Sequence, residues 1–388
     1  MYGLIIALFL FIIYGIIEYQ QHQNNRKKIP EIIHVNGTRG KSSVTRLIAG
    51  GLRAGGIATI AKTTGSAPVI IFEDGNEIPI KRHFSPNIRE QLKIIKFASR
   101  RNINTLVLEC MAVRPEYQWE TEHKMVRSSI GVITNSRPDH LDVMGPGLRN
   151  VTLSLCNSIP GRGQIFTSEN KVLPLMQKQA KKHHSQLISV ESETVSDSDM
   201  KGFKHVEHIE NVALALKVCE KYGISRETAL KGMYEAKPDV GATETFAVKH
   251  KGKTIFFVHS FAANDPESTL YIIDYVRKLH PHLESVAFVL STREDRMFRS
   301  KQLVYMMKDL PYDELFLVGQ QTAAIKNYSQ KIGISNKVTD CGWVSGEKFL
   351  QKVMKMPAKE ILLFGIGNIH GNGSILVNYF KERHGKHV

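Results

Sequence analysis

Short apolar runs alternate with amphipathic stretches along most of the chain after residue 30. Residues 32–35, 105–109 and 130–134 have the length and composition of buried strands, and polar residues stand at the end of each run. Helical patterns lie between such runs, for example at residues 42–54 and 209–222. This alternation predicts an α/β fold built on a parallel-type sheet.

A second α/β alternation begins near residue 240. The segment 237–241 contains Pro238 and Gly241, which favour a loop, and strand patterns recur at residues 254–258, 285–290, 314–318 and 360–364. We therefore predict a central domain at residues 31–240 and a smaller C-terminal α/β domain at residues 241–388.

The first residues have a different character. Residues 3–17 are almost wholly apolar, and the polar run at 20–28 ends in Arg26, Lys27 and Lys28. A membrane span usually needs ~20 apolar residues, so this segment is short, but it has neither the basic start nor the cleavage site of a signal peptide. We predict an uncleaved membrane anchor at residues 1–19 and a linker at 20–30, with the basic cluster keeping the body in the cytoplasm. The alternative is a buried helix of a soluble protein.

Composition narrows the class of partner. The chain has 388 residues, of which 42% are hydrophobic and 23% charged, values typical of globular proteins, and a formal net charge of +15. The basic residues are scattered and not interleaved with aromatic residues, so we expect no nucleic-acid partner. Anionic lipid or acidic substrates remain as partners for the positive charge, and a soluble surface rich in lysine without a specific partner is an equal alternative. The four cysteines form no C-x-x-C pair, which indicates reduced thiols and not a zinc site.

The chain's most informative stretch is the end of the first strand and the turn that follows it. The sequence Gly37-Thr38-Arg39-Gly40-Lys41-Ser42-Ser43 places two glycines, a lysine and a serine where a strand gives way to a helix. Glycines let the backbone approach a phosphate, and the helix start offers free N–H groups. Val35 stands where the strict nucleotide-loop pattern has a further glycine. The segment nevertheless predicts a phosphate-binding loop, with Lys41 on the phosphates.

Oxygen and imidazole groups after neighbouring strands are candidate Mg²⁺ ligands. Ser42 and Glu109 supply hard oxygen atoms, and His140 stands between Asp139 and Asp142 in a polar loop after residues 130–134. Ligands collect at the carboxyl ends of strands in open α/β sheets. Glu109 could instead be a solvated strand-end acid, and His140 a core or capping histidine.

These motifs, in this order, resemble the ATP-dependent amide ligases of the Mur ligase family. The similarity is greatest to the branch of that family that makes poly-γ-glutamate. The matching segments are the N-terminal anchor, Gly37–Leu47, Asn87-Ile88, Glu109-Cys110-Met111-Ala112, Thr134-Asn135, Asp139–Pro146, Asn211–Ala215, Phe261–Asp265 and Gly367–Gly371. The resemblance covers nearly the whole chain.

The resemblance implies a central P-loop ATPase domain, a smaller Rossmann-like domain, and ATP and Mg²⁺ as cofactors. It implies catalytic roles for Lys41, Glu109 and His140, and metal ligation by Ser42, Glu109 and His140. The implied nucleotide contacts are Gly37, Thr38, Arg39, Gly40, Lys41, Ser42, Ser43, Asn87, Asn211 and, in place of the family's ribose-binding acid, Asp265.

The implied activity is polymerisation of glutamate into poly-γ-glutamate through an acyl phosphate, with release of ADP and phosphate. The implied location is the cell membrane, beside integral membrane subunits of a capsule synthesis and export complex. Four arginines are candidate contacts for glutamate carboxylates: Arg114, Arg137, Arg293 and Arg296. Two alternatives remain: a glutamate ligase acting on a small acceptor such as a folate, and a membrane-tethered ATPase that regulates polymer transport.

Overall fold

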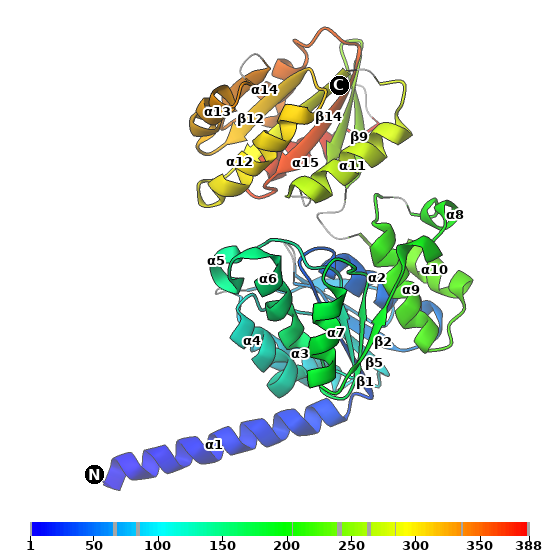
Figure 1. Ribbon diagram of the computed structural model, residues 1–388, viewed down its shortest axis with the longest axis vertical. Helices are drawn as coiled ribbons and strands as arrows, with labels where there is room; N and C mark the ends of the chain where they lie inside the picture. Colours follow the sequence, from blue (N-terminus) through cyan, green and yellow to red (C-terminus); the bar gives the residue numbers. More distant parts are fainter. Residues whose placement is uncertain are drawn as a thin grey trace. The chain divides into compact units, whose positions relative to one another are not determined.

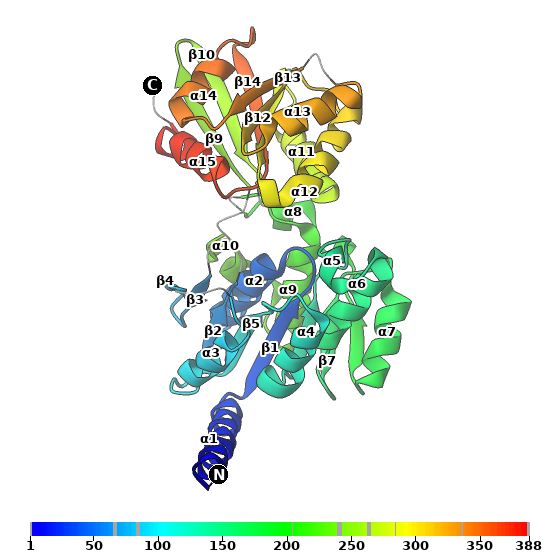
Figure 2. The same cartoon turned by 90° about the vertical axis from the view of Figure 1, so that its left-hand side faces the viewer.

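The chain folds into two compact units, Met1–Asp239 and Val240–Val388. The computed structural model, drawn in Figures 1 and 2, describes residues 2–64, 68–82, 86–203, 205–238, 243–261, 265–283, 285–334 and 337–385. The predicted boundary at residue 240 lies outside the described residues and stays a prediction. Both units contain a mostly parallel sheet covered by helices, so the predicted α/β class is confirmed.

In the described part of unit 1, eight strands form one sheet in the order β4-β3-β2-β5-β1-β6-β7-β8. The pairs β2–β3 and β3–β4 are antiparallel, and every other pair is parallel. The strands are β1 (Glu31–Asn36), β2 (Thr59–Lys62), β3 (Val69–Ile71), β4 (Glu77–Pro79), β5 (Thr105–Glu109), β6 (Ile130–Ile133), β7 (Gln164–Thr167) and β8 (Gln186–Ser189). The phosphate loop follows β1, which lies between β5 and β6, so the ends of all three strands meet at one place.

Helices cover both faces of this sheet. On one face α2, α9 and α10 pack on residues such as Ile33 and Val35, and on the other α3 and η1 pack on Ile32 and Leu106. The helices of unit 1 are α1 (Tyr2–Lys27), α2 (Lys41–Ala54), α3 (Glu90–Ala98), α4 (Pro115–Glu120), the π-helical η1 (Thr121–Val126), α5 (Leu141–Met144), α6 (Gly147–Leu155), η2 (Cys156–Ser158), α7 (Leu173–Lys182), η3 (Ser192–Thr194), α8 (Asp197–Met200), α9 (Ile209–Lys221) and α10 (Arg226–Glu235). Because successive strand residues face opposite sides, β1 carries apolar side chains on both faces.

The helix α1 runs from Tyr2 to Lys27 and projects from unit 1 (Figure 1). Its apolar residues are exposed, and its most apolar 18-residue window has a mean hydropathy of 2.1. Length and composition would let it cross a membrane. The linker predicted at 20–30 is instead helical as far as Lys27, because its glutamine, asparagine and basic residues do not break a helix; Pro30 lies beyond the helix end.

Unit 2 has its own six-stranded sheet among its described residues, in the order β13-β12-β11-β14-β10-β9. Only the edge pair β9–β10 is antiparallel in this sheet as described. The elements are β9 (Glu244–His250), β10 (Lys253–His259), α11 (Pro266–Leu279), β11 (Ser285–Thr292), η4 (Glu294–Arg296), α12 (Met297–Met306), η5 (Met307–Asp309), β12 (Glu314–Gly319), α13 (Thr322–Lys331), β13 (Val338–Gly342), α14 (Gly346–Val353), β14 (Glu360–Gly367) and α15 (Asn372–Glu382). A core of Phe257, Phe349 and Phe380 packs between this sheet and α14–α15.

Candidate active site

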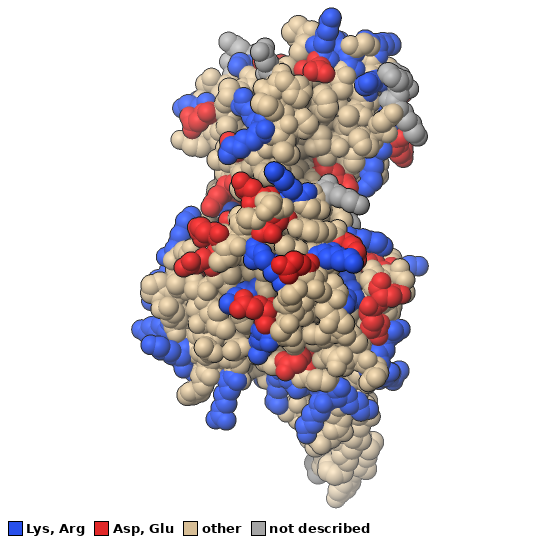
Figure 3. Space-filling model, turned by 90° about the vertical axis from the view of Figure 1, so that its right-hand side faces the viewer, with Lys and Arg blue, Asp and Glu red and all other residues tan. Residues whose placement is uncertain are grey.

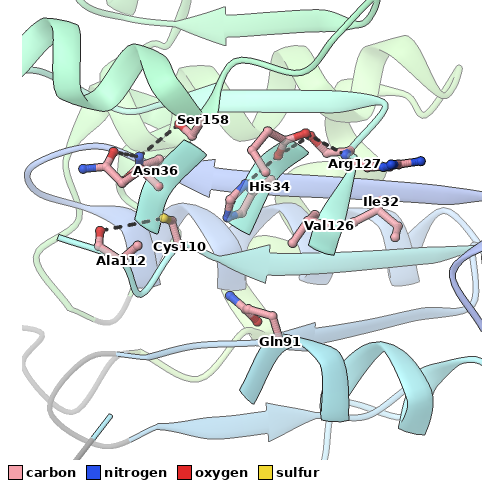
Figure 4. Close-up of polar contacts among 12 residues, drawn as sticks. Ile32, His34, Asn36, Gln91, Cys110, Ala112, Val126, Arg127 and Ser158 are labelled. Carbon is pink, nitrogen blue, oxygen red and sulfur yellow. Dashed lines mark hydrogen bonds and ion pairs between the residues drawn. The ribbon is translucent and has the colours of Figure 1, made fainter. Parts of the chain in front are cut away.

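Asn36, the last residue of β1, fixes the start of the phosphate loop. It is buried; its Oδ1 accepts a hydrogen bond from Gly37 N (2.8 Å), and its Nδ2 donates to Gln118 Oε1 (2.8 Å) and Ser158 Oγ (3.0 Å). Figure 4 shows this asparagine at the strand end, beside Ser158. All polar atoms of its amide are paired, so the point where the chain leaves the sheet is rigid.

The two glycines of the loop are required by both conformation and space. Gly37 has φ +136° and Gly40 has φ +79°, values that side chains rarely adopt. A Cβ on Gly37 would lie 2.0 Å from Thr134 Oγ1, and a Cβ on Gly40 would lie 2.5 Å from Asn211 Oδ1. The loop is therefore packed directly against the end of β6 and the start of α9.

Lys41 is the first residue of α2, and its side chain folds back over the loop. Its Nζ donates to Gly37 O (2.7 Å) and Thr38 O (3.3 Å). Burial lowers the pKa of Lys41, while the nearby Glu109 carboxylate acts in the opposite direction. Ser42 and Ser43 follow in the first turn of α2, where backbone N–H groups have no partner within the helix. An anion at this helix end meets both the N–H groups and the ammonium.

Ser42 and Glu109 lie together, as the sequence predicted for a shared metal site. Ser42 Oγ donates to Glu109 Oε2 (2.8 Å), and Thr64 N donates to the same oxygen (2.6 Å). Both side chains are nearly buried, and Glu109 ends β5 opposite Val35 of β1. Gln91 Nε2 donates to the Glu109 carbonyl (3.0 Å) and ties α3 to this strand end. The alternative of a solvated strand-end acid is therefore wrong for Glu109.

The end of β6 clamps the loop from the other side. Asn135 Oδ1 accepts from Arg39 N (3.0 Å), and Thr38 N donates to Asn135 O (3.1 Å). Arg39 also forms an ion pair with Asp139 (3.2 Å), the residue before His140. The motif after β6 is thereby connected directly to the phosphate loop.

His140 stands at the start of α5 with φ +47°, a strained left-handed conformation for a side chain of this size. Its backbone N–H donates to Asp139 Oδ1 (3.1 Å), and its Nε2 lies 3.9 Å from Asp139 Oδ2. The helix-start position matches the capping alternative, although its side chain forms no cap hydrogen bond. Its metal role stays a prediction.

Asn211 and Glu207 form a buried pair behind Gly40. Asn211 Nδ2 donates to Glu207 Oε1 (2.8 Å), and His205 lies 3.6 Å from the other carboxylate oxygen. Burial alone would raise the pKa of Glu207, but hydrogen bonds from His205 and Asn211 hold it below its ordinary value. The structure thus places Asn211 against the loop, and its predicted contact with adenine stays a prediction.

Two other predicted nucleotide contacts lie in turns. Asn87 is exposed before α3, where its Oδ1 accepts from Arg89 N (2.9 Å). Asp265 caps α11 in unit 2 by accepting from Ser268 N (3.0 Å). Residues 262–264 of its motif lie outside the described residues. The contacts of Asn87 and Asp265 with a nucleotide stay predictions.

Lys62 is a buried charged residue near Glu109 that the sequence analysis did not single out. It ends β2, is fully buried, and its Nζ lies 2.8 Å from Glu90 Oε1, while Arg82 Nε lies 2.8 Å from the other oxygen. Burial lowers the pKa of Lys62; for Glu90 burial has the opposite effect, but Arg82 and Lys62 lower its pKa to about 2. The cluster holds the ends of the segment that carries Asn87. In the sequence, a lysine at the end of an apolar strand could have pointed to this cluster, but its partner Glu90 is 28 positions away.

A second buried polar group joins β1 to η1. His34 Nδ1 lies 2.8 Å from Glu122 Oε2, and both side chains are almost completely inaccessible. Burial alone would lower the pKa of His34, but Cys110 and Glu122 raise it to about 10. Ser128 donates to Glu122 from both its N–H (2.8 Å) and its hydroxyl (2.9 Å). His34 lies in β1, and Cys110 directly follows the neighbouring strand β5; Figure 4 shows both side chains.

The chain is similar to known proteins over both of its units. The central residues 35–237 match the Mur ligase middle domain, and residues 245–383 match the poly-gamma-glutamate synthase CapB C-terminal domain. The chain is 34% identical over 388 residues to the PGA synthase CapB of Bacillus subtilis (strain 168), covering 98% of each chain. It belongs to the CapB family of Mur ligases.

Other similarities agree with the family. The capsule biosynthesis protein CapB of Bacillus anthracis is 36% identical over 384 residues, covering 97% of this chain and 82% of that protein. A bifunctional folylpolyglutamate synthase/dihydrofolate synthase, solved with Mn, AMPPNP and L-glutamate bound, superposes with a TM-score of 0.67. The two chains are 12% identical, and the superposition covers 93% of this chain and 92% of that one. At this identity the likeness shows the fold alone. The predicted membership of the Mur ligase family, its fold and the assignment as an ATP-dependent amide ligase are confirmed.

Proposed function

We propose that this chain polymerises glutamate into poly-γ-glutamate, using ATP and Mg²⁺ and releasing ADP and phosphate. The observation that supports this most directly is the group Lys41, Ser42 and Glu109 at the phosphate loop. The chain that carries this group is similar in sequence, over nearly its whole length, to a PGA synthase.

The residues at this loop fit a polyphosphate with a divalent cation. The Ser42 hydroxyl and the Glu109 carboxylate are hard oxygen donors 2.8 Å apart, and Lys41 lies one residue away. Ser42 and Glu109 would hold one Mg²⁺, and His140 would serve a second. Such ions, when bound, neutralise charge on the phosphoryl group during its transfer. Gly37 to Ser43 would surround the phosphates, with Asn87, Asn211 and Asp265 as further nucleotide contacts.

The proposed reaction transfers a phosphoryl group and then forms an amide. A substrate carboxylate oxygen attacks the γ-phosphorus of ATP, the bond to the β-phosphate oxygen breaks, and ADP leaves with that electron pair. The amine of the second substrate then attacks the carbonyl carbon of the acyl phosphate. The carbon–oxygen bond to phosphate breaks, phosphate leaves with that electron pair, and the nitrogen loses its proton to solvent as the amide forms. Lys41 holds the transferring group in place and stabilises its charge, which is most of what phosphoryl transfer requires of a protein.

The substrates are acidic throughout. A growing γ-linked glutamate chain carries one free carboxylate per residue, and arginine binds carboxylates through two parallel hydrogen bonds. Arg114, Arg137, Arg293 and Arg296 are our candidates for these contacts. The net charge of +15 favours association with a polyanion.

We further propose that α1 anchors the enzyme in the cell membrane with both units in the cytoplasm, beside integral membrane subunits. The support is the exposed apolar face of α1 and the basic cluster at Arg26–Lys28. One helix cannot form a pore, so export of a polymer requires such partners.

The deciding experiment measures ADP release and peptide mass together. Membranes containing the chain and its partner subunits receive Mg²⁺, ATP and either L- or D-glutamate, and products are separated by mass spectrometry. Glutamate-dependent ADP with a ladder of glutamate-spaced masses is the expected result. ADP without the ladder would favour the transport regulator, a single addition to a folate would favour the small-acceptor ligase, and AMP with the ladder would overturn the acyl-phosphate mechanism.

A further inference from the structure

The C-terminal third of α1 is docked onto unit 1. His22 Nε2 lies 2.7 Å from Met125 O, and Arg26 Nη2 donates to Arg127 O (2.6 Å). On its other side, Asn25 Oδ1 accepts from Ser99 Oγ (3.2 Å) after α3. The helix therefore leaves unit 1 in a direction fixed by contacts with α3 and η1.

The same contacts bring basic and aromatic side chains to the level where the apolar part of α1 begins. Arg89 Nη2 donates to Glu18 Oε1 (2.9 Å), and Arg127 Nη2 donates to Tyr19 OH (3.4 Å). Residues 2–17, immediately before this level, are all exposed wherever described. In a bilayer that encloses these apolar residues, Arg89 and Arg127 lie at the headgroups.

α3 and the segment α4–η1 carry further basic and aromatic side chains beside Arg89 and Arg127. Lys93 and Lys96 on α3, with Arg89 just before the helix and Arg100 just after it, recur at helical spacing and are exposed. Residues 89–101 contain five basic residues and one acidic residue. Figure 3 shows lysine and arginine side chains near the base of α1, on the side of unit 1 that faces the viewer there.

The helical segment α4–η1 adds the aromatic component. Trp119 is 41% exposed, and Lys124 Nζ lies 5.3 Å from the centre of its ring. The acidic residue of this contact, Glu120, is paired with Lys124 (3.2 Å). Tryptophan beside lysine is the side-chain combination enriched at membrane interfaces, where the ring lies at the headgroup level.

We propose that this surface, formed by Arg89, Lys93, Lys96, Trp119, Lys124 and Arg127, rests on the anionic headgroups of the bilayer that holds α1. Its positive charge complements anionic lipid, and it is continuous with the apolar part of α1. The contact adds a second attachment to the anchor and holds unit 1 in one orientation on the membrane. The inference rests on the membrane-anchor proposal for α1 but not on the ligase reaction.

The chain offers its own reporter, because it has two tryptophans, Trp119 in unit 1 and Trp343 in unit 2. The full-length variants Trp343→Phe and Trp119→Phe each keep one of them. Both are reconstituted into vesicles of phosphatidylcholine and phosphatidylglycerol, with or without lipids brominated near the headgroup, which quench tryptophan on contact. We expect Trp119 to lose about half of its fluorescence, and Trp343 reports separately on unit 2. An unquenched Trp119 would overturn the proposal.

Charge reversal tests the electrostatic part. In the Trp343→Phe background, Lys93→Glu with Lys96→Glu should at least halve the quenching of Trp119 in anionic vesicles. Lys221→Glu with Lys231→Glu is the matched control, since these exposed lysines lie on α9 and α10, which cover the opposite face of the sheet. A control as damaging as the test pair would contradict a specific surface.

Flotation of the vesicles separates the possible failures. Chain that floats while Trp119 stays unquenched would overturn the surface and leave the anchor in place; chain that fails to float would overturn both. A Trp119 response to soluble poly-γ-glutamate without vesicles would assign the surface to the polymer and overturn the lipid proposal.

Discussion

Lys41 is positioned by the backbone of the loop that it serves. Its Nζ lies on the carbonyls of Gly37 and Thr38, and burial disfavours its charged form until an anion is near. This arrangement couples the charge of Lys41 to phosphate binding. Burial destabilises the charged ammonium, and the negative charge of a bound phosphate would stabilise it.

Lys41→Ala should lower glutamate-dependent ADP formation at least about 100-fold, the effect of removing one positioned charge from a transition state. Steady-state ADP release measures it, and Lys221→Ala, at an exposed position on α9, serves as the control. Normal ligation by the Lys41 variant would contradict the phosphate-loop assignment.

Comparing Gly40 with Gly56 distinguishes the effect of backbone strain from the effect of a steric contact, because both have the same φ angle. Gly40 and Gly56 both have φ +79°, but a Cβ on Gly40 would lie 2.5 Å from Asn211 Oδ1, whereas a Cβ on Gly56 meets nothing within 4 Å. Gly56→Ala should lower the free energy of unfolding by about 1 kcal/mol, from left-handed strain alone, with nucleotide affinity unchanged.

Gly40→Ala should lower that free energy further and also weaken nucleotide binding, because Asn211 or the loop must move. Urea unfolding and ADP titration measure the two quantities. Equal effects of the two substitutions would show that the contact with Asn211 is unimportant.

At the scale of elements, β1 depends on a buried ionic contact between two distant segments. His34 lies in the strand and Glu122 in the π-helical η1, 88 positions apart, and Ser128 completes the carboxylate's hydrogen bonds. The pair therefore joins the strand under the phosphate loop to the helical segment that contacts α1.

Glu122→Gln should lower the free energy of unfolding by about 3 kcal/mol, since it leaves one member of a buried pair without its counter-charge. Glu220→Gln is the control, because Glu220 pairs with Lys217 at the surface and its loss should change stability by less than about 1 kcal/mol. Denaturant unfolding distinguishes the two.

The pair also predicts a pH dependence. The pKa of His34 is raised from 6.5 to about 10, so protonated His34 stabilises the fold fully below pH 6.5 and loses this effect as pH rises towards 10. Stability measured between these pH values should therefore fall in the native chain. It should fall less in Glu122→Gln, where Cys110 alone is left to raise the pKa of His34. A native chain whose stability does not fall over this range would show that His34 is neutral.

At the scale of the whole molecule, the proposal that α1 anchors the chain in a membrane can be tested by mutation. Leu8→Arg with Ile12→Arg should move the chain from the membrane to the soluble fraction, because each arginine at the middle of a span costs about 2.5–3.5 kcal/mol. Gln20→Arg with Asn24→Arg adds the same charge at the polar end of α1 and should leave the chain in the membrane. Alkaline washing and sedimentation of membranes provide the measurement.

The order of apolar and polar residues alone determined much of this protein. The strand-loop-helix around Lys41, the strand that ends in Glu109, the second α/β alternation and the exposed apolar helix all follow from local patterns, because each depends on residues close together in the chain. The pairing of Ser42 with Glu109 could also be predicted, since parallel strands bring their carboxyl ends to one edge.

The tertiary structure alone decided the rest. The contacts of Gly40 with Asn211, Lys62 with Glu90 and His34 with Glu122 join residues 28 to 171 positions apart, and no local pattern encodes them. The same holds for the docking of α1 on α3 and η1. Buried polar groups must find partners wherever the packed chain brings them, and packing is a property of the whole unit.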